Sequence, residues 1–292
     1  MAKIFPFHPF RYSEGAGPLV SLVTQPYDKI SPAMRATYLQ QSPYNLVRII
    51  LGEATPDDAP GNNVYTRAAE HLRDWIDKGI LRSEKEPSLY AYFQEFRVPD
   101  TGEILVRKGF IGLGALEDYS AGVVHRHEQT LSGPKKDRLE LLRHTHAHFG
   151  QLFMLYPDPQ GEVDALLDEV AKGEPVEQVS DEYGAAHRVW KISDPALVAR
   201  IQQLMADKKL LIADGHHRYE TALAFSKENP GLAGADKVMM TFVNMYSLGL
   251  KILATHRVVS NLDGFDTTAF FARAEASFTV ERLDSSLDLS QR

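Results

Sequence analysis

The chain has 292 residues, and its 32 Lys and Arg against 39 Asp and Glu give a formal charge of −7. Hydrophobic residues make up 43% and charged residues 24%, which is typical of a globular protein and excludes a disordered chain, and no apolar run is long enough to cross a bilayer. The absence of cysteine excludes disulfides, zinc–thiolate sites, iron–sulfur clusters and a cysteine nucleophile. A cytoplasmic location is expected because no signal-peptide pattern is present, and the acidic balance argues against DNA as a partner.

Apolar runs and turn signals alternate in the N-terminal part of the chain. Val20–Val23 is a short apolar run, and Ser31-Pro32 predicts a helix start with Ser as N-cap and Pro at the first helical position. The stretch Glu53–Asn63 is rich in turn residues and is the most linker-like part of the chain. The spacing of apolar residues over Tyr65–Ile76 then predicts a helix, with a left-handed C-terminal cap at Gly79.

Strand and helix patterns also alternate in the rest of the chain. Leu89–Phe96 and Glu103–Leu113 have strand composition and flank the turn Pro99–Gly102, which predicts a β-hairpin. The other expected elements are, in chain order, a helix over Asp137–Thr145, a helix capped by Asp194, a strand over Leu210–Ala213, a helix from Tyr219, strands over Val238–Met245 and Leu250–Ala254, and a helix capped by Asp266.

This mixture predicts an α+β (mixed α/β) fold. Residues 1–52 are expected to form an N-terminal segment that contributes to the core, and residues 64–260 to form the main α/β domain. Residues 261–292 are expected to form a C-terminal helix and a polar tail.

The strongest local signal is Asp214-Gly215-His216-His217-Arg218, between a predicted strand and a predicted helix. A helix N-terminus offers unpaired N–H groups and a partial positive charge, which attract phosphate, and Gly215 lets a ligand approach the backbone. Arg218 can donate a forked pair of hydrogen bonds to phosphate, and Asp214 could hold Mg²⁺ or position a substrate hydroxyl. The alternative is a tight turn capped by Asp214, but two adjacent histidines between an acid and an arginine favour a functional site.

A second signal begins where the apolar run Gly122–Val124 ends, at His127-Glu128. A carboxylate between basic groups is held ionised near neutral pH, which suits a general base. Lys135 and Arg138 follow and could supply anion contacts. Taken alone, the segment is more simply interpreted as a polar loop with an ordinary surface ion pair.

Two further groups of polar residues are weaker signals. The first group lies at a predicted strand end and consists of Thr255, His256 and Arg257. Their hydroxyl, imidazole and guanidinium groups could bind a carboxylate or phosphate. Three alternating histidines would share one face of a strand and could hold a metal ion: His144, His146 and His148. Because a helix is predicted through Thr145, these side chains point in different directions, which favours ordinary hydrogen-bonding histidines.

Several short motifs resemble the domain-of-unknown-function 1015 family. They are Pro26-Tyr27-Asp28, Ser42-Pro43-Tyr44-Asn45, Gly109-Phe110-Ile111-Gly112, Gly133-Pro134-Lys135 and the stretch from Ala213 to Ala222. The matches extend from near the N-terminus to about Arg257, and the Asp-Gly-His-His-Arg stretch is the specific one.

A more distant resemblance implies a chemistry. His127-Glu128-Gln129 and Asp214–Arg218 are similar to two motifs of archaeal free serine kinase, which belongs to the ParB/sulfiredoxin superfamily. The resemblance implies a ParB/sulfiredoxin-like nucleotide-binding core with large insertions, a nucleotide-binding Gly-x-x-Arg turn at Gly215–Arg218, and Mg²⁺ near Asp214. It also implies that Glu128 is the base for the serine hydroxyl, and that substrate contacts come from His127, Thr255, His256 and Arg257. The segment between the two motifs is longer here than in the kinase, which indicates an insertion or a rearrangement.

These motifs together predict a phosphotransferase that moves a phosphoryl group from ADP or ATP to a small hydroxylated metabolite, with free L-serine as the first candidate. The expected catalytic residues are Glu128, Asp214 and His217. The expected phosphate contacts are Gly215, His216, His217, Arg218, Lys135 and Arg138. The partners are then a nucleotide and a small molecule, with neither DNA nor a membrane. Two alternatives stay open: a nucleotide-binding regulatory module without phosphoryl transfer, and a metal-dependent hydrolase that uses the three alternating histidines.

Overall fold

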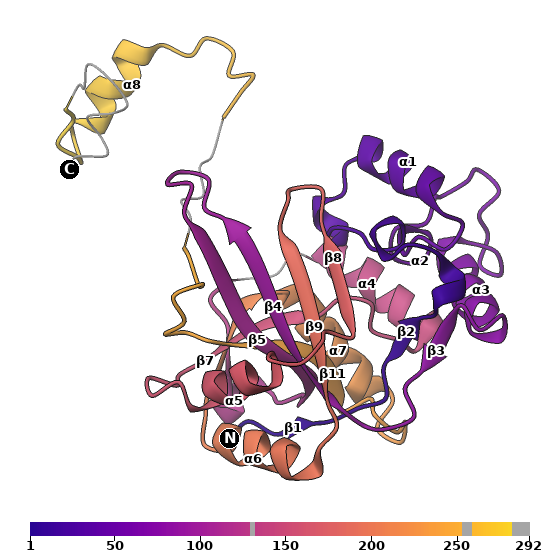
Figure 1. Ribbon diagram of the computed structural model, residues 1–292. Helices are drawn as coiled ribbons and strands as arrows, with labels where there is room; N and C mark the ends of the chain where they lie inside the picture. Colours follow the sequence, from indigo (N-terminus) through magenta and orange to yellow (C-terminus); the bar gives the residue numbers. More distant parts are fainter. Residues whose placement is uncertain (129–131, 253–258, 282–292) are drawn as a thin grey trace. The chain divides into compact units, whose positions relative to one another are not determined.

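A nine-stranded mixed sheet organises most of the protein. The computed structural model describes residues 1–128, 132–252 and 259–281. Contacts divide the chain into two compact units, Met1–Lys251 and Ile252–Arg292. The strand order in the first unit is β6-β10-β7-β11-β5-β4-β9-β8, with β1 paired to β5. Figure 1 shows the long strands β4 and β5 side by side in this sheet. The strands are β1 (Ile4–Phe5), β4 (Leu89–Arg97), β5 (Ile104–Ala115), β6 (Val124–His125), β7 (Leu152–Tyr156), β8 (Glu177–Ser180), β9 (Ala186–Ile192), β10 (Leu210–Asp214) and β11 (Lys237–Asn244).

Parallel and antiparallel pairs are combined in this sheet. β6 runs parallel to β10 and β7 runs parallel to β11, while the other neighbours are antiparallel. The predicted hairpin is confirmed as β4 and β5, and an α+β fold is confirmed with it. The strand predicted over Leu250–Ala254 is wrong for residues 250–252, which are in no strand, and residues 253–254 lie outside the described residues.

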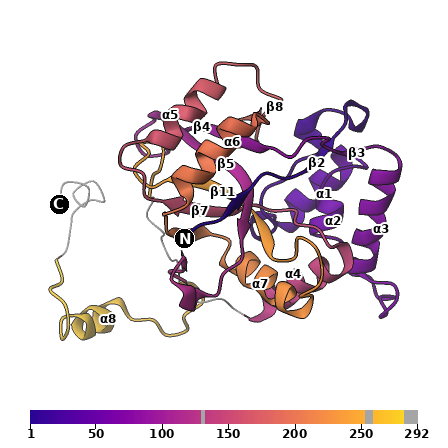
Figure 2. The same ribbon diagram turned by 90° about the horizontal axis from the view of Figure 1, so that it is seen from below.

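Helices lie on both faces of the sheet. α5 (Glu162–Val170) and α6 (Pro195–Met205) lie on one side, and α4 (Ser132–Thr145) and α7 (His216–Glu228) on the other (Figure 2). On β5, the Lys108 ammonium pairs with Asp168 of α5 at 2.7 Å. Because side chains alternate along a strand, the neighbouring Arg107 belongs to the opposite face, toward α4 and α7.

The remaining α-helices are α1 (Pro32–Gln41), α2 (Val47–Ile50), α3 (Val64–Asp77) and, in the second unit, α8 (Thr267–Ala274). The predicted caps are confirmed, because the Ser31 hydroxyl accepts from an N–H of α1 and the Asp194 and Asp266 carboxylates accept from those of α6 and α8. Gly79 follows α3 with a φ of 67°, as the left-handed cap requires.

Two separate hydrophobic clusters stabilise the first unit. The larger one is formed by the sheet with α5, α6 and α7 and includes Phe110, Tyr156 and Phe242. The smaller one gathers the N-terminal segment, α3 and one residue of α4 around Trp75, with β2 (Phe10–Tyr12) and β3 (Leu81–Ser83) beside it. The N-terminal segment is therefore divided: Ala2 and Ile4 belong to the larger cluster, because β1 pairs with β5, and the part from Tyr12 onward packs on α3 and α4.

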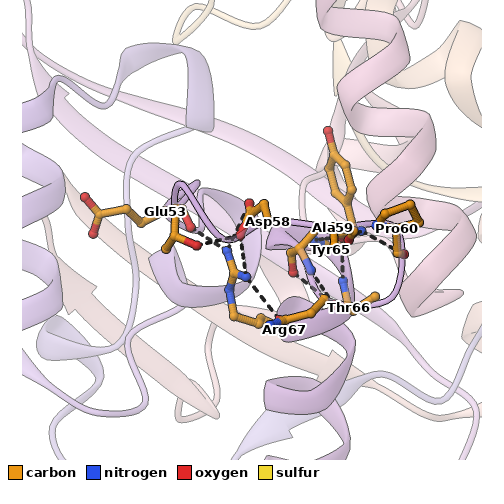
Figure 3. Close-up of polar contacts among 10 residues, drawn as sticks. Glu53, Asp58, Ala59, Pro60, Tyr65, Thr66 and Arg67 are labelled. Carbon is orange, nitrogen blue, oxygen red and sulfur yellow. Dashed lines mark hydrogen bonds and ion pairs between the residues drawn. The ribbon is translucent and has the colours of Figure 1, made fainter.

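The linker-like stretch before α3 is an ordered loop. Figure 3 shows the Arg67 guanidinium at its centre, donating to the Asp58 carboxylate at 2.8 Å and to the Glu53 carbonyl at 2.6 Å. Asn63 caps α3 through its side chain, and the Thr66 hydroxyl accepts from the Asn63 N–H in return, which forms a capping box. The polar composition of Glu53–Asn63 is typical of a linker. The structure shows an ordered loop instead, because side-chain hydrogen bonds, such as those from Arg67, hold it in place without apolar contacts. Among the described residues, no helix is long and apolar enough to cross a membrane.

Candidate functional site

The sheet topology brings the two polar motifs together. β6 and β10 are parallel neighbours, with Val124 opposite Leu210 and His125 opposite Leu211. Parallel strands end at the same edge of a sheet, so the residues that follow β6 lie beside those that follow β10. His127 and His216 are consequently in contact although they are 89 residues apart in sequence.

A carboxylate and two imidazoles form the centre of this contact. The Glu128 carboxylate lies 3.5 Å from Nδ1 of His216 and 3.8 Å from Nε2 of His127. The two imidazole rings meet edge to face with centroids 4.6 Å apart. The His216 side chain is 2% exposed, whereas that of Glu128 is 65% exposed and can reach a ligand.

The surroundings of His216 define its protonation. Burial, followed by the nearby His127, lowers the pKa of His216, which favours the neutral ring. The backbone N–H of His127 points to Nε2 of His216 at 3.4 Å, which assigns the single ring proton to Nδ1. That proton faces Glu128, so His216 can donate to the carboxylate and orient it.

The N-terminus of α7 has no side-chain cap. Gly215 is its N-cap, with a φ of 97°, and provides no side-chain oxygen for the first-turn N–H groups. A Cβ at Gly215 would lie 2.9 Å from Leu152 Cδ2, so only glycine fits both the conformation and the space. The helix predicted from Tyr219 begins at His216 instead, because left-handed Gly215 turns the chain directly into it. His216, His217 and Arg218 thus form the first helical turn.

Asp214 and Arg218 are paired across this turn. Nη2 of Arg218 donates to Asp214 Oδ2 at 2.6 Å, and Nη1 donates to the Gln151 carbonyl. The forked pair predicted for a phosphate is therefore used within the protein, which fixes the guanidinium beside the helix N-terminus. Arg218 can then attract an anion through its charge and through Nε, which has no acceptor among the described residues.

Lys135 does not point at the α7 N-terminus. Its ammonium lies 2.6 Å from Glu220 Oε2, and Arg126 binds the other oxygen of that carboxylate at 3.2 Å. The predicted phosphate contact of Lys135 is therefore replaced by an ion pair one turn into α7. This pair ties the start of α4 to α7.

Arg138 points to a different place, beside Tyr27. Its guanidinium carbon lies 4.2 Å from the centre of the Tyr27 ring, and it also binds Asp137 and the Ile50 carbonyl. Burial raises the pKa of Tyr27, while the positive charges of Arg138 and Arg218 oppose that rise, so both arginines lie near the phenol. The sequence showed the Pro26-Tyr27-Asp28 motif without a role, and the structure places its tyrosine against a predicted anion-binding arginine.

Tyr27, Arg138, Asp214 and Arg218 line one cavity of about 740 Å³. Its floor is the face of the sheet that carries α7, and its other wall is the N-terminal segment with α4. Sequence reasoning named His148 only as a candidate metal ligand, and it missed the other polar residues of the lining, which are Gln94, Arg107, Gln151, His187 and Thr241. The Thr221 hydroxyl also lines it, is buried and has no partner among the described residues. A volume of this size suits a nucleotide or a metabolite.

The alternating histidines do not form a metal site. His144 stacks on Tyr65, His146 packs on Phe225, and His148 lines the cavity. Within the described ranges, the one set of three His or acidic residues with ligand atoms within 4.8 Å of one another is His127, Glu128 and His216. Each member offers one ligand atom, so this set, and not the alternating histidines, could hold a metal ion. The segment with Thr255, His256 and Arg257 lies outside the described residues.

We expect the stability of the protein to fall in mild acid because of His148. Burial lowers the pKa of His148 to about 4. Between that value and the ordinary pKa of about 6.5, the unfolded chain binds a proton that the folded chain does not. The free energy of unfolding should therefore fall as the pH drops through this window, by up to about 1.4 kcal/mol per pH unit. Urea unfolding at several pH values should show a smaller fall in His148→Gln, and equal falls in both proteins would contradict this assignment.

The comparisons with known proteins identify a family and no characterised relative. No curated protein and no solved structure matches the chain. The model of the family described as "Protein of unknown function (DUF1015)" matches residues 4–291. The match includes the strands, helices and loops that build the site, and the chain therefore belongs to the domain-of-unknown-function 1015 family.

Proposed function

We propose that the protein is a phosphotransferase that moves a phosphoryl group from a nucleotide, ADP or ATP, to a small hydroxylated metabolite, with free L-serine as the first candidate. The observation that supports this most is the position of Glu128 beside the N-terminus of α7, which has no side-chain cap. Glu128 follows β6, a strand that is far from α7 in sequence. A carboxylate that can accept a proton and a helix end that attracts phosphate are the two parts that phosphoryl transfer needs. The similarity of both motifs to free serine kinase supports the same reaction.

The proposed reaction assigns one task to each group. The acceptor hydroxyl oxygen bonds to the terminal phosphorus of the nucleotide, the bond from that phosphorus to the bridging oxygen breaks, and the hydroxyl proton passes to Glu128. His216 holds the carboxylate in place through Nδ1–H. The first turn of α7, with Arg218 beside it, neutralises the charge on the phosphates.

The residues present fit a magnesium ion that arrives with the nucleotide. Asp214 gives one carboxylate oxygen to Arg218 and keeps the other without a protein partner among the described residues. Magnesium sites in nucleotide enzymes typically use one or two carboxylates together with the phosphates. Bound there, Mg²⁺ would supply charge neutralisation of the phosphoryl group.

The test is a transfer screen with radiolabelled nucleotide. Purified protein, Mg²⁺ and nucleotide labelled in the terminal phosphate should transfer label to at least one acceptor in a panel of hydroxylated amino acids, hydroxy acids and polyols. If no acceptor is labelled by either ADP or ATP while the nucleotide binds tightly, the proposal is wrong and a regulatory nucleotide-binding module explains the site instead.

A further inference from the structure

Arg107 is the cavity-lining arginine whose charge is unbalanced. Three arginines line the cavity, all in the described part of the chain: Arg107, Arg138 and Arg218. Arg138 pairs with Asp137 and Arg218 pairs with Asp214. Arg107 has no carboxylate partner among the described residues, and its polar contact is with the neutral side-chain oxygen of Gln94.

The acidic side chains of the cavity cannot supply the missing charge. They are Glu177, Asp181 and Asp214, and each has a partner of its own. Glu177 binds Arg11 at 2.5 Å, and Asp181 accepts from His187 at 3.3 Å and from two backbone N–H groups. The acids of the lining equal its arginines in number, but none of them lies within ion-pair distance of Arg107, so its guanidinium has no carboxylate contact among the described residues.

Two aromatic rings lie near the guanidinium of the half-buried Arg107. Its central carbon lies 4.8 Å from the centre of the Phe153 ring and 6.0 Å from that of Phe96. Burial lowers the pKa of Arg107, which reports the cost of keeping the charge away from water. A guanidinium in such surroundings gains most from an anion that replaces its lost hydration.

The surroundings favour a carboxylate over a phosphate. A single guanidinium has the geometry to donate two parallel hydrogen bonds to one carboxylate, and the charges of the two groups cancel. A phosphate dianion at the same place would leave one negative charge uncompensated beside aromatic rings and a neutral amide. Phe153 on β7 also pairs with Asp214 on β10. The Arg107 guanidinium therefore contacts a residue that neighbours the strand end from which α7 begins.

We propose that the cavity binds a small carboxylate-bearing molecule whose carboxylate pairs with Arg107. The inference concerns binding alone, and it stands whether or not a phosphoryl group is transferred at the α7 end. Glu128 is not among the residues that line this cavity, so the inference assigns Glu128 no contact with the bound acid.

Binding can be measured without nucleotide. We would titrate the full chain with lactate, glycerate, L-serine and 3-hydroxybutyrate, with the matching primary amides, and with inorganic phosphate, by calorimetry and by ligand-observed NMR. At least one acid should bind about ten- to hundredfold more tightly than its amide, the range expected for a charged hydrogen-bonded pair. Arg107→Gln should remove that difference, and Arg107→Lys should retain part of it because the charge remains without the fork.

Arg97→Gln provides the matched control. Arg97 is on β4, in the same hairpin, is exposed and donates to the Gly102 carbonyl, so its loss removes one positive charge away from the cavity. The affinity of the Arg97→Gln variant for the acids should equal that of the wild type. Thermal unfolding without ligand checks the fold of Arg107→Gln, and the acids should raise the melting temperature of the wild type but not of this variant. Equal binding of acids and amides, unchanged acid binding in Arg107→Gln, or phosphate binding that depends on Arg107 would each overturn the proposal.

Discussion

Replacement of Glu128 by glutamine should lower the rate of phosphoryl transfer about 10²–10⁴-fold, the usual contribution of a positioned general base. Glutamine has nearly the shape of glutamate but cannot take the hydroxyl proton. The Kd for the nucleotide should stay nearly unchanged, because the proposed phosphate contacts come from the start of α7 and from Arg218 and not from Glu128. Single-turnover label transfer measures the first quantity and calorimetric titration the second.

Glu169→Gln is the control for this experiment. Glu169 is an exposed glutamate on α5 that pairs with Lys172 on the same surface, so the substitution removes an equal charge away from the site. It should transfer label at the wild-type rate. Wild-type turnover in Glu128→Gln would show that Glu128 is not the base, even if the protein proves to be a kinase.

Replacement of Arg218 by alanine should weaken nucleotide binding about ten- to hundredfold, as expected when a charged hydrogen-bonding group is removed from an anion site. The same change frees the Asp214 carboxylate, which then repels the phosphates and adds to the loss. Label transfer should fall at least as much at subsaturating nucleotide. Arg218→Lys should recover part of the affinity because a cation remains.

The control for Arg218 is an arginine of α4 that binds the other end of α7. Arg143 pairs with Glu228, the last residue of α7, at 2.6 Å. Arg143→Ala removes the same charge and one ion pair to α7 without touching the site, and it should bind nucleotide like the wild type. If Arg218→Ala and Arg143→Ala lose nucleotide affinity equally, the loss reflects net charge or helix stability and not a phosphate contact of Arg218.

Local patterns predicted much of the fold, because they depend on neighbours in sequence. The caps of α1, α6 and α8 and the β4–β5 hairpin follow from residues within a few positions of each other. The strand β7 escaped prediction although it lies between β10 and β11 in the sheet. Its place depends on pairing with strands far along the chain, which no local pattern encodes.

The candidate site was predicted only in part, for a similar reason. The motif after β10 identified the helix N-terminus, but the meeting of Glu128 with His216 depends on β6 being the parallel neighbour of β10. The direction of Lys135 toward Glu220 depends on where α4 crosses α7, and the sequence does not show it. Arg107 escaped because one basic residue beside Lys108 in a strand looks like surface charge. Its place on the same face as Ile111 was the available signal.

The two hydrophobic clusters leave the space between them to polar contacts. One cluster supports the floor of the cavity and the other supports its N-terminal wall. Ion pairs join the two sides where α4 meets α7, Lys135 with Glu220 and Arg143 with Glu228. A ligand that contacts Tyr27 on the N-terminal wall and Arg218 on α7 would therefore connect two separately packed parts of the first unit.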